Sequence, residues 1–145
     1  MEIAPVDDKE RLFVASAIDD WATIERLGIK VVIDLEGDID QGVPTVPGTI
    51  LYIYLPLHDD PELPNLHKLH AVARLAADLY EQDYRIVSHC GMGLNRSALM
   101  AGLVLCELGW KGCDAVTRLQ ERRTGALYNE VFHEYLMEMQ ARTRG

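Results

Sequence analysis

Short apolar runs alternate with polar segments along the first ninety residues, and this alternation predicts a series of strands. Four runs are rich in β-branched or large apolar residues and have the length of strands that are buried in a sheet. They cover residues 11–16, 30–37, 49–57 and 85–90. The segments 38–48 and 58–64 between them contain prolines with glycines or acidic residues, which predicts exposed loops.

Helical periodicity occupies the segments between and after these strands. Residues 64–82 carry apolar side chains at alternating steps of three and four, which makes one apolar stripe along a helix. The segment 96–108 carries charge only near its ends, so a helix there would be apolar nearly all round and would lie in the centre of the molecule. The other predicted helices cover 18–28, 113–123 and 127–142.

Strands that alternate with helices and are followed by a helical tail predict an α/β fold. The long connections between the strands favour parallel neighbours that are joined by right-handed crossovers. We therefore expect one domain over residues 1–145, with a mixed, mostly parallel central sheet flanked by helices. Ligands of such folds bind at the carboxyl ends of the strands, and the segment that follows residues 85–90 lies at such an end.

The composition mainly indicates which kinds of partner the protein would not bind. The 145 residues are 48% hydrophobic and 26% charged, which is ordinary for a globular protein, and the net charge is −9. An acidic surface repels phosphate backbones and anionic membranes, so we expect no membrane partner and no nucleic acid. The longest uncharged apolar run, 98–106, is far too short to span a bilayer, and the N-terminus lacks the apolar stretch of a secretory signal.

Three cysteines, Cys90, Cys106 and Cys113, form an odd number without the spacing of a disulfide framework. This usage favours free thiols in a reducing compartment, so we expect a cytoplasmic protein. The spacing of the cysteines and histidines does not predict a zinc site, and we expect the protein to need no metal and no other cofactor.

The segment "RIVSHCGMGLNRSALM" (85–100) interrupts the apolar pattern with the features of an anion site. A strand ends, a short loop turns through Gly91 and Gly93, and a helix begins near Arg96. The backbone N–H groups of such a loop and of the helix N-terminus form a cradle for an anion, and the planar guanidinium of Arg96 suits two phosphate oxygens. The same field favours the thiolate of Cys90, and a thiolate that faces a bound phosphate is set up to attack phosphorus.

The residues "HCGMGLNRS" (89–97) resemble the signature of the cysteine-dependent protein tyrosine phosphatase superfamily at the histidine, the cysteine, the second glycine, the arginine and the serine. The length of the chain and the order of its elements from Arg11 to Leu136 are similar to those of the small atypical dual-specificity phosphatases. The resemblance implies a dual-specificity phosphatase fold. It also implies a hydrolase that acts on phosphate monoesters through a phosphocysteine intermediate.

The resemblance further implies a role for each matching position. Cys90 would be the nucleophile, Arg96 would bind the phosphoryl oxygens and stabilise the transition state, and Ser97 would hydrogen-bond the departing sulfur. His89 would brace the loop and help to hold the thiolate. The backbone cradle would consist of Gly91, Met92, Gly93, Leu94, Asn95 and Arg96. Simpler roles stay open for two side chains, because Ser97 can be a helix-start residue and His89 a hydrogen-bonded core histidine.

Departure of an alkoxide or phenolate requires a proton donor, and in the family an aspartate from a loop about thirty residues before the cysteine supplies the proton. The segment "PLHDDPELP" (56–64) offers Asp59 and Asp60. The family pattern of an apolar strand, a proline and then an aspartate favours Asp59, with Asp60 as the alternative. Both can also be turn residues before Pro61, where aspartate is common.

The signature loop, formed by residues 89–97, also indicates which substrates the site would accept. Relatives that hydrolyse phosphoinositides carry lysines where this loop has Met92 and Leu94, which argues against an inositol lipid. The chain has no obvious equivalent of the aromatic recognition loop of tyrosine-specific relatives, so we expect a shallow site for phosphotyrosine and also for phosphoserine and phosphothreonine. Two alternatives stay open. One is an RNA 5′-phosphatase, because Asn95 precedes Arg96 as in that branch, and the other is a non-catalytic phosphate-binding pseudophosphatase.

Residues nearer the C-terminus complete the candidate site. Arg122 and Arg123 either contact anions of the substrate or complement the C-terminus of a helix. Asn129 matches a family asparagine, and we expect it to support the site structurally. We expect a monomer that acts on phosphorylated proteins or peptides and on small phosphate esters.

Overall fold

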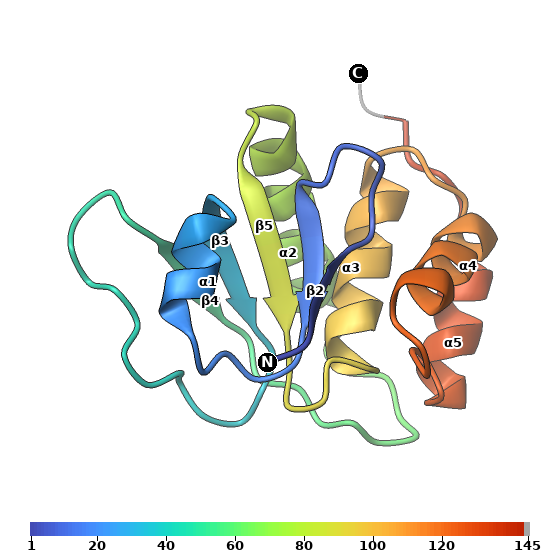
Figure 1. Cartoon of the computed structure of the whole chain (residues 1–145). Helices are drawn as coiled ribbons and strands as arrows, with labels where there is room; N and C mark the ends of the chain where they lie inside the picture. The colour runs from blue at the N-terminus through green and yellow to red at the C-terminus, as the bar shows by residue number, and fades with distance from the viewer. Residues whose placement is uncertain (144–145) are drawn as a thin grey trace.

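The computed structural model describes residues 1–143 and has a sheet of five strands with helices on both faces (Figure 1). The strands are β1 (Ile3–Pro5), β2 (Leu12–Ala15), β3 (Ile29–Asp34), β4 (Leu51–Tyr54) and β5 (Arg85–His89). The helices are α1 (Trp21–Arg26), α2 (Leu66–Glu81), α3 (Arg96–Glu107), α4 (Gly112–Arg122) and α5 (Glu130–Met137).

The strand order is β1-β2-β5-β3-β4, and β2, β5, β3 and β4 are mutually parallel. This arrangement confirms the predicted mixed, mostly parallel sheet. The sequence analysis missed β1, which pairs antiparallel with β2 at the edge of the sheet. Three residues that include a proline carry little strand signal of their own, and an edge position is where a sheet tolerates proline.

The ends of several elements differ from the prediction. The helix predicted over 127–142 begins at Glu130 and ends at Met137. It begins late because Leu127 has a left-handed backbone (φ 61°) and because Asn129 caps the first turn with its side chain. The strands predicted over 30–37 and 49–57 end at Asp34 and Tyr54.

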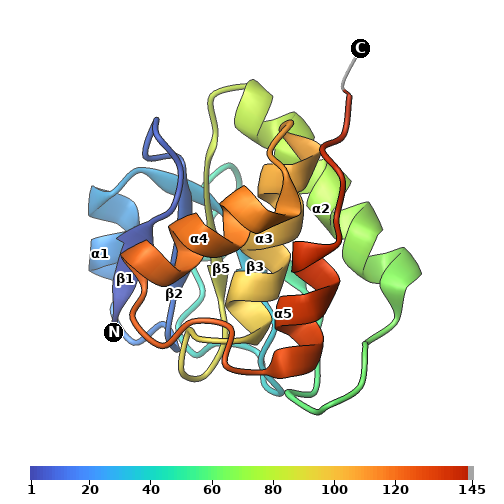
Figure 2. The same ribbon diagram turned by 90° about the vertical axis from the view of Figure 1, so that its right-hand side faces the viewer.

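Helix α3 is the centre of the molecule, as its apolar sequence predicts. Every residue from Ser97 to Glu107 is buried, between the sheet on one side and α2, α4 and α5 on the others (Figure 2). On the opposite face of the sheet, Ile24 of α1 packs in a second apolar cluster. Because α3 is held on all sides, the loop that leads into it from β5 has a fixed position.

Residues 1–143 contain no helix whose length and apolar character would let it cross a membrane.

Candidate active site

The segment between β5 and α3 forms a tight loop at the carboxyl ends of the parallel strands (Figure 1). Cys90 follows the last residue of β5, and the residue is only 2% exposed. Its backbone N–H donates to the carbonyl oxygen of Ala15 in β2 at 3.2 Å, which ties the start of the loop to the sheet. The loop then ends at the N-terminus of α3, where unpaired N–H groups and the positive end of the helix dipole meet.

The sulfur of Cys90 lies next to a hydroxyl group. Sγ is 3.4 Å from Oγ of Ser97, and both residues are buried. The hydroxyl of Ser88, in β5, donates to the carbonyl oxygen of Ser97 at 2.9 Å, so strand and helix are joined directly behind the sulfur. The structure therefore brings Cys90 and Ser97 together as the sequence analysis expected.

The side chain of Arg96 folds back over the loop. A Cβ atom placed on Gly91 would lie 3.5 Å from Nη2 of Arg96, and Nη1 donates to the carbonyl oxygen of Leu57 at 3.3 Å. Nε is buried and has no hydrogen-bond partner within residues 1–143. A buried donor without a partner is costly, and an oxyanion in the cradle would satisfy it.

Arg123, at the end of α4, braces the loop from outside. Nη2 donates to the carbonyl oxygen of Met92 at 2.6 Å, and Nε donates to that of Gly93 at 3.2 Å. Arg122 donates to the carbonyl oxygen of Pro5 at 3.3 Å. Arg122 lies in the last turn of α4 and Arg123 is its C-cap, as a role in complementing the helix C-terminus requires, and both side chains in addition bind carbonyl groups of other segments. Because the carbonyl groups of Met92 and Gly93 point toward Arg123, the N–H groups of the loop point to the opposite side, as an anion cradle requires.

Gly93 has a backbone that only glycine adopts easily here. Its φ is +71°, and a Cβ atom would lie 2.7 Å from backbone atoms of Ala15 and Ser16. We therefore expect Gly93→Ala to displace the loop and to lower the free energy of unfolding by about 1–3 kcal/mol, as overpacking usually does. Chemical denaturation and phosphate titration would measure both effects. A variant with the stability and phosphate affinity of the original chain would contradict this description of the loop.

Residues 58–64 form the loop that carries the candidate acid, hereafter the acid loop, and this loop contacts the signature loop through Asp59. Its Oδ2 accepts from Nδ2 of Asn95 at 2.9 Å, and its Oδ1 accepts from Nδ2 of Asn129 at 2.8 Å. Asp60 contributes only its backbone carbonyl, which accepts from the same amide of Asn129 at 2.9 Å. The structure thus brings the side chain of Asp59, and not that of Asp60, to the signature loop, and the side chain of Asn129 contacts both residues.

His89 belongs to a buried polar network that the sequence analysis did not foresee. Nε2 lies 2.7 Å from Oδ2 of Asp40 and 3.6 Å from Oδ1 of Asp34. The hydroxyl of Tyr52 donates to Asp34 and accepts from the backbone N–H of Asp40. Burial raises the pKa of the Asp40 carboxyl, and burial together with the hydrogen bond to Asp34 raises the pKa of Tyr52. His89 therefore braces the end of β5 through β3, β4 and the 38–48 loop.

Two carboxylates and the imidazole of this network form the one group within residues 1–143 whose donor atoms could hold a metal ion. The ligand atoms of Asp34, Asp40 and His89 lie within 4.8 Å of one another. The sequence analysis foresaw no such group. Each carboxylate, however, already accepts from the imidazole, from Tyr52 or from a backbone N–H, so direct hydrogen bonds account for the arrangement.

A family model described as the catalytic domain of dual specificity phosphatases matches residues 12–142. The chain belongs to this family. No curated protein sequence matches it. The resemblance that the signature residues carry is thus confirmed for nearly the whole chain.

Solved structures show that this dual-specificity phosphatase domain has the fold of its family. Human DUSP28 has a TM-score of 0.80 and 20% sequence identity, over 95% of this chain and 92% of that one. A mouse putative dual specificity phosphatase complexed with zinc tungstate has a TM-score of 0.77 and 23% sequence identity, over 95% of this chain and 86% of that one. The human tyrosine phosphatase-like serine/threonine/tyrosine-interacting protein has a TM-score of 0.74 and 21% sequence identity, over 94% of this chain and 93% of that one.

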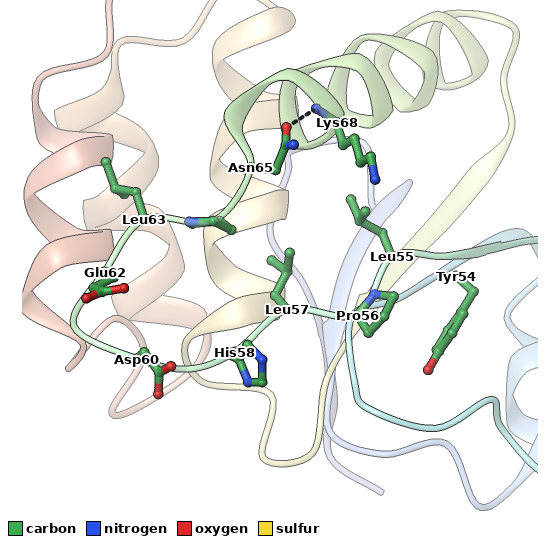
Figure 3. Close-up of a pocket in the computed structure, with 11 residues that line it drawn as sticks. Tyr54, Leu55, Pro56, Leu57, His58, Asp60, Glu62, Leu63, Asn65 and Lys68 are labelled. Carbon is green, nitrogen blue, oxygen red and sulfur yellow. Dashed lines mark hydrogen bonds between the residues drawn. The ribbon is translucent and has the colours of Figure 1, made fainter.

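In this phosphatase domain a cavity of about 500 Å³ adjoins the acid loop (Figure 3). The segment from Tyr54 to Asn65 curves around it, and Lys68 of α2 closes one side. Leu57 and His58, which directly precede Asp59, belong to its lining, whereas Cys90 and Arg96 do not. The cavity is therefore a neighbour of the anion cradle rather than the cradle itself.

Proposed function

We propose that this dual-specificity phosphatase domain hydrolyses phosphate monoesters in proteins or peptides through a phosphocysteine intermediate. Phosphotyrosine is the first substrate we expect, with phosphoserine and phosphothreonine beside it. The observation that carries the proposal is the sulfur of Cys90 at the signature loop, 3.4 Å from Oγ of Ser97, beside a buried donor of Arg96 that has no partner among residues 1–143. The mouse relative forms a complex with zinc tungstate, which supports an oxyanion as a ligand of this fold.

In the first step the thiolate of Cys90 attacks phosphorus and the phosphorus–oxygen bond to the leaving group breaks. Arg96 and the N–H groups of the loop hold the phosphoryl oxygens, whose charge they stabilise in the transition state. Asp59, held beside the signature loop by Asn95, gives its proton to the leaving oxygen. The products are the free alcohol or phenol and phosphocysteine.

In the second step a water molecule attacks the phosphocysteine and the phosphorus–sulfur bond breaks. The carboxylate of Asp59 takes the proton of the water, which restores the acid for the next cycle. The sulfur leaves as a thiolate, and the hydroxyl of Ser97 stabilises it by donating a hydrogen bond across the 3.4 Å that separates the two atoms. The residues of the chain supply every proton and charge that these steps need.

Two features bear on which phosphorylated chains would bind. Met92 of the signature loop is 62% exposed and apolar, so this position adds no cation for a polyphosphorylated head group. The cavity beside the acid loop lies next to Asp59, where side chains that flank a phosphorylated residue would pass. Both features favour a phosphorylated peptide over a small polyanion.

Phosphate release from an aryl phosphate, measured with reductant and EDTA present, tests the proposal. Turnover that the chelator leaves unchanged supports it. Inorganic phosphate that binds without any turnover of aryl phosphates or phosphopeptides would contradict it and would support a binding module instead.

Replacing Asp59 with asparagine tests the acid. We expect kcat/KM of the unaltered domain to rise and then fall with pH, and the fall at high pH reflects the need for a protonated acid. Asp59→Asn cannot titrate, so the high-pH fall should disappear and the rate with phenyl phosphate should drop about 10²-fold. Asp60→Asn is the control, and we expect it to keep both the rate and the pH profile. The reverse pattern would assign the acid to Asp60.

A further inference from the structure

Asn95 has an unusual position for a buried polar residue. It is 2% exposed and directly precedes α3, where an asparagine normally caps the helix with its side chain. Here the side chain makes no capping hydrogen bond to α3. It reaches outward instead, so that its hydrogen-bonding capacity serves other segments of the chain.

Both ends of the Asn95 amide are occupied. Nδ2 donates to Oδ2 of Asp59 at 2.9 Å, and Oδ1 accepts from the backbone N–H of Asn129 at 2.9 Å. The donor end therefore meets the acid loop, and the acceptor end meets the start of α5. Such a bidirectional bridge has one orientation of the amide that satisfies both partners.

Asn129 closes the ring from the other side. Its Nδ2 donates to Oδ1 of Asp59 at 2.8 Å and to the carbonyl oxygen of Asp60 at 2.9 Å, while its Oδ1 caps α5. Each oxygen of the Asp59 carboxylate thus accepts from a different amide. Asp59 itself is exposed, on a segment without regular secondary structure, so these contacts rather than packing hold the carboxylate in one place.

We propose that Asn95 is a positioning residue that holds the carboxyl group of Asp59 at the signature loop before the substrate binds. The inference rests on the proposed function, since it assigns Asn95 a role in the proton transfer of that reaction. Asn95 lies one residue before Arg96, so the same short loop places the phosphate and the acid together. Loss of the Asn95 amide leaves Asp59 with one anchor, and the acid then spends less time in the productive position.

The leaving group separates this role from a merely structural one. A leaving group of high basicity, such as phenolate, needs the proton of the acid, whereas dinitrophenolate leaves readily without it. The readout is kcat/KM, which reports the attack of the thiolate and not the later hydrolysis of phosphocysteine. We expect Asn95→Ala to lower kcat/KM about tenfold for phenyl phosphate and less than about twofold for dinitrophenyl phosphate. We also expect it to change kcat/KM for phenyl phosphate less than about twofold when Asp59→Asn is already present, because the two residues act as a unit.

Gln120→Ala is the matched control. Nε2 of Gln120, in α4, donates to the carbonyl oxygen of Ala126 at 3.3 Å, so this variant also loses a side-chain amide that joins two segments, while the hydrogen bonds of Asp59 described above do not involve Gln120. We expect it to keep the leaving-group dependence of the unaltered domain. An equal loss for both leaving groups in Asn95→Ala, or a loss that persists in the Asp59→Asn background, would overturn the inference in favour of loop packing.

Amide hydrogen exchange of Leu57, whose N–H donates to the carbonyl oxygen of Leu35 at 3.0 Å, tests the same clamp without turnover. Exchange in Asn95→Ala should be at least about tenfold faster than in Gln120→Ala, since one of two anchors of the acid loop is lost. Equal exchange in the two variants would overturn the inference. A domain that shows this exchange difference but releases no phosphate would refute the proposed function and leave the clamp in place.

Discussion

Cys90→Ser is expected to abolish phosphate release while the domain still folds and still binds an oxyanion. The hydroxyl of serine stays protonated where a thiol can ionise, and the hydrogen-bond partner of the Cys90 sulfur, the hydroxyl of Ser97, is not a general base. The loss of kcat should be at least about 10⁴-fold, as for removal of other enzymatic nucleophiles. The cradle of backbone N–H groups and Arg96 stays, so binding of inorganic phosphate or tungstate, followed by calorimetry, should change little.

Cys113→Ser supplies the matched control for that experiment. Cys113 is exposed on α4, while Cys90 is buried at the loop, and all three cysteines are free. We expect Cys113→Ser to keep the full rate. If Cys90→Ser retains more than about one per cent of the rate, the chemistry does not depend on this thiol.

Arg96→Lys should have the second largest effect. A guanidinium presents two parallel N–H donors to two phosphoryl oxygens, whereas an ammonium group is a point charge without that fork. The side chain of Arg96 also binds the carbonyl oxygen of Leu57, next to the acid loop, and lysine cannot serve both partners. We expect kcat to fall about 10²- to 10³-fold, the cost of losing one transition-state donor, with a smaller change in KM.

Arg85→Lys tests whether that loss is specific to the site. Arg85 starts β5 at the opposite end of the strand from Cys90, and its guanidinium donates to the carbonyl oxygen of Leu27. The variant changes the same pair of residue types at an exposed position, so steady-state rates should stay unchanged. Equal losses in the two variants would mean that stability, rather than transition-state binding, controls the rate.

Local patterns were enough to predict most of the sheet and the core of the site. The apolar runs before Cys90 and the uncharged run after Arg96 identified β5 and α3 because strand and helix periodicity are local properties of a sequence. The loop between them was predictable for the same reason, since its glycines, cysteine and arginine lie within eight residues. The family match confirms the resemblance that these residues carry, and the similar folds confirm the fold class.

The contacts that organise the site were not predictable, because they join residues that lie far apart in the sequence. Asn95 and Asp59 are 36 positions apart, and His89 and Asp40 are 49 positions apart. The family pattern favoured Asp59, but nothing in "HDDPEL" (58–63) shows that its carboxylate meets Asn95 and Asn129. The sequence also gave no reason to expect that Arg123 would bind carbonyl groups of the loop rather than an anion.

The central claim is a covalent phosphoryl group on Cys90, and rapid acid quenching followed by mass spectrometry tests it most directly. Asp59→Asn should be mixed with dinitrophenyl phosphate, because this leaving group departs without a proton while the attack of water on the phosphocysteine still needs the carboxylate. The account predicts that one phosphoryl group accumulates on the peptide that contains Cys90 and that it is absent from Cys90→Ser. Rapid turnover without any adduct on Cys90, or an adduct on another residue, would contradict it.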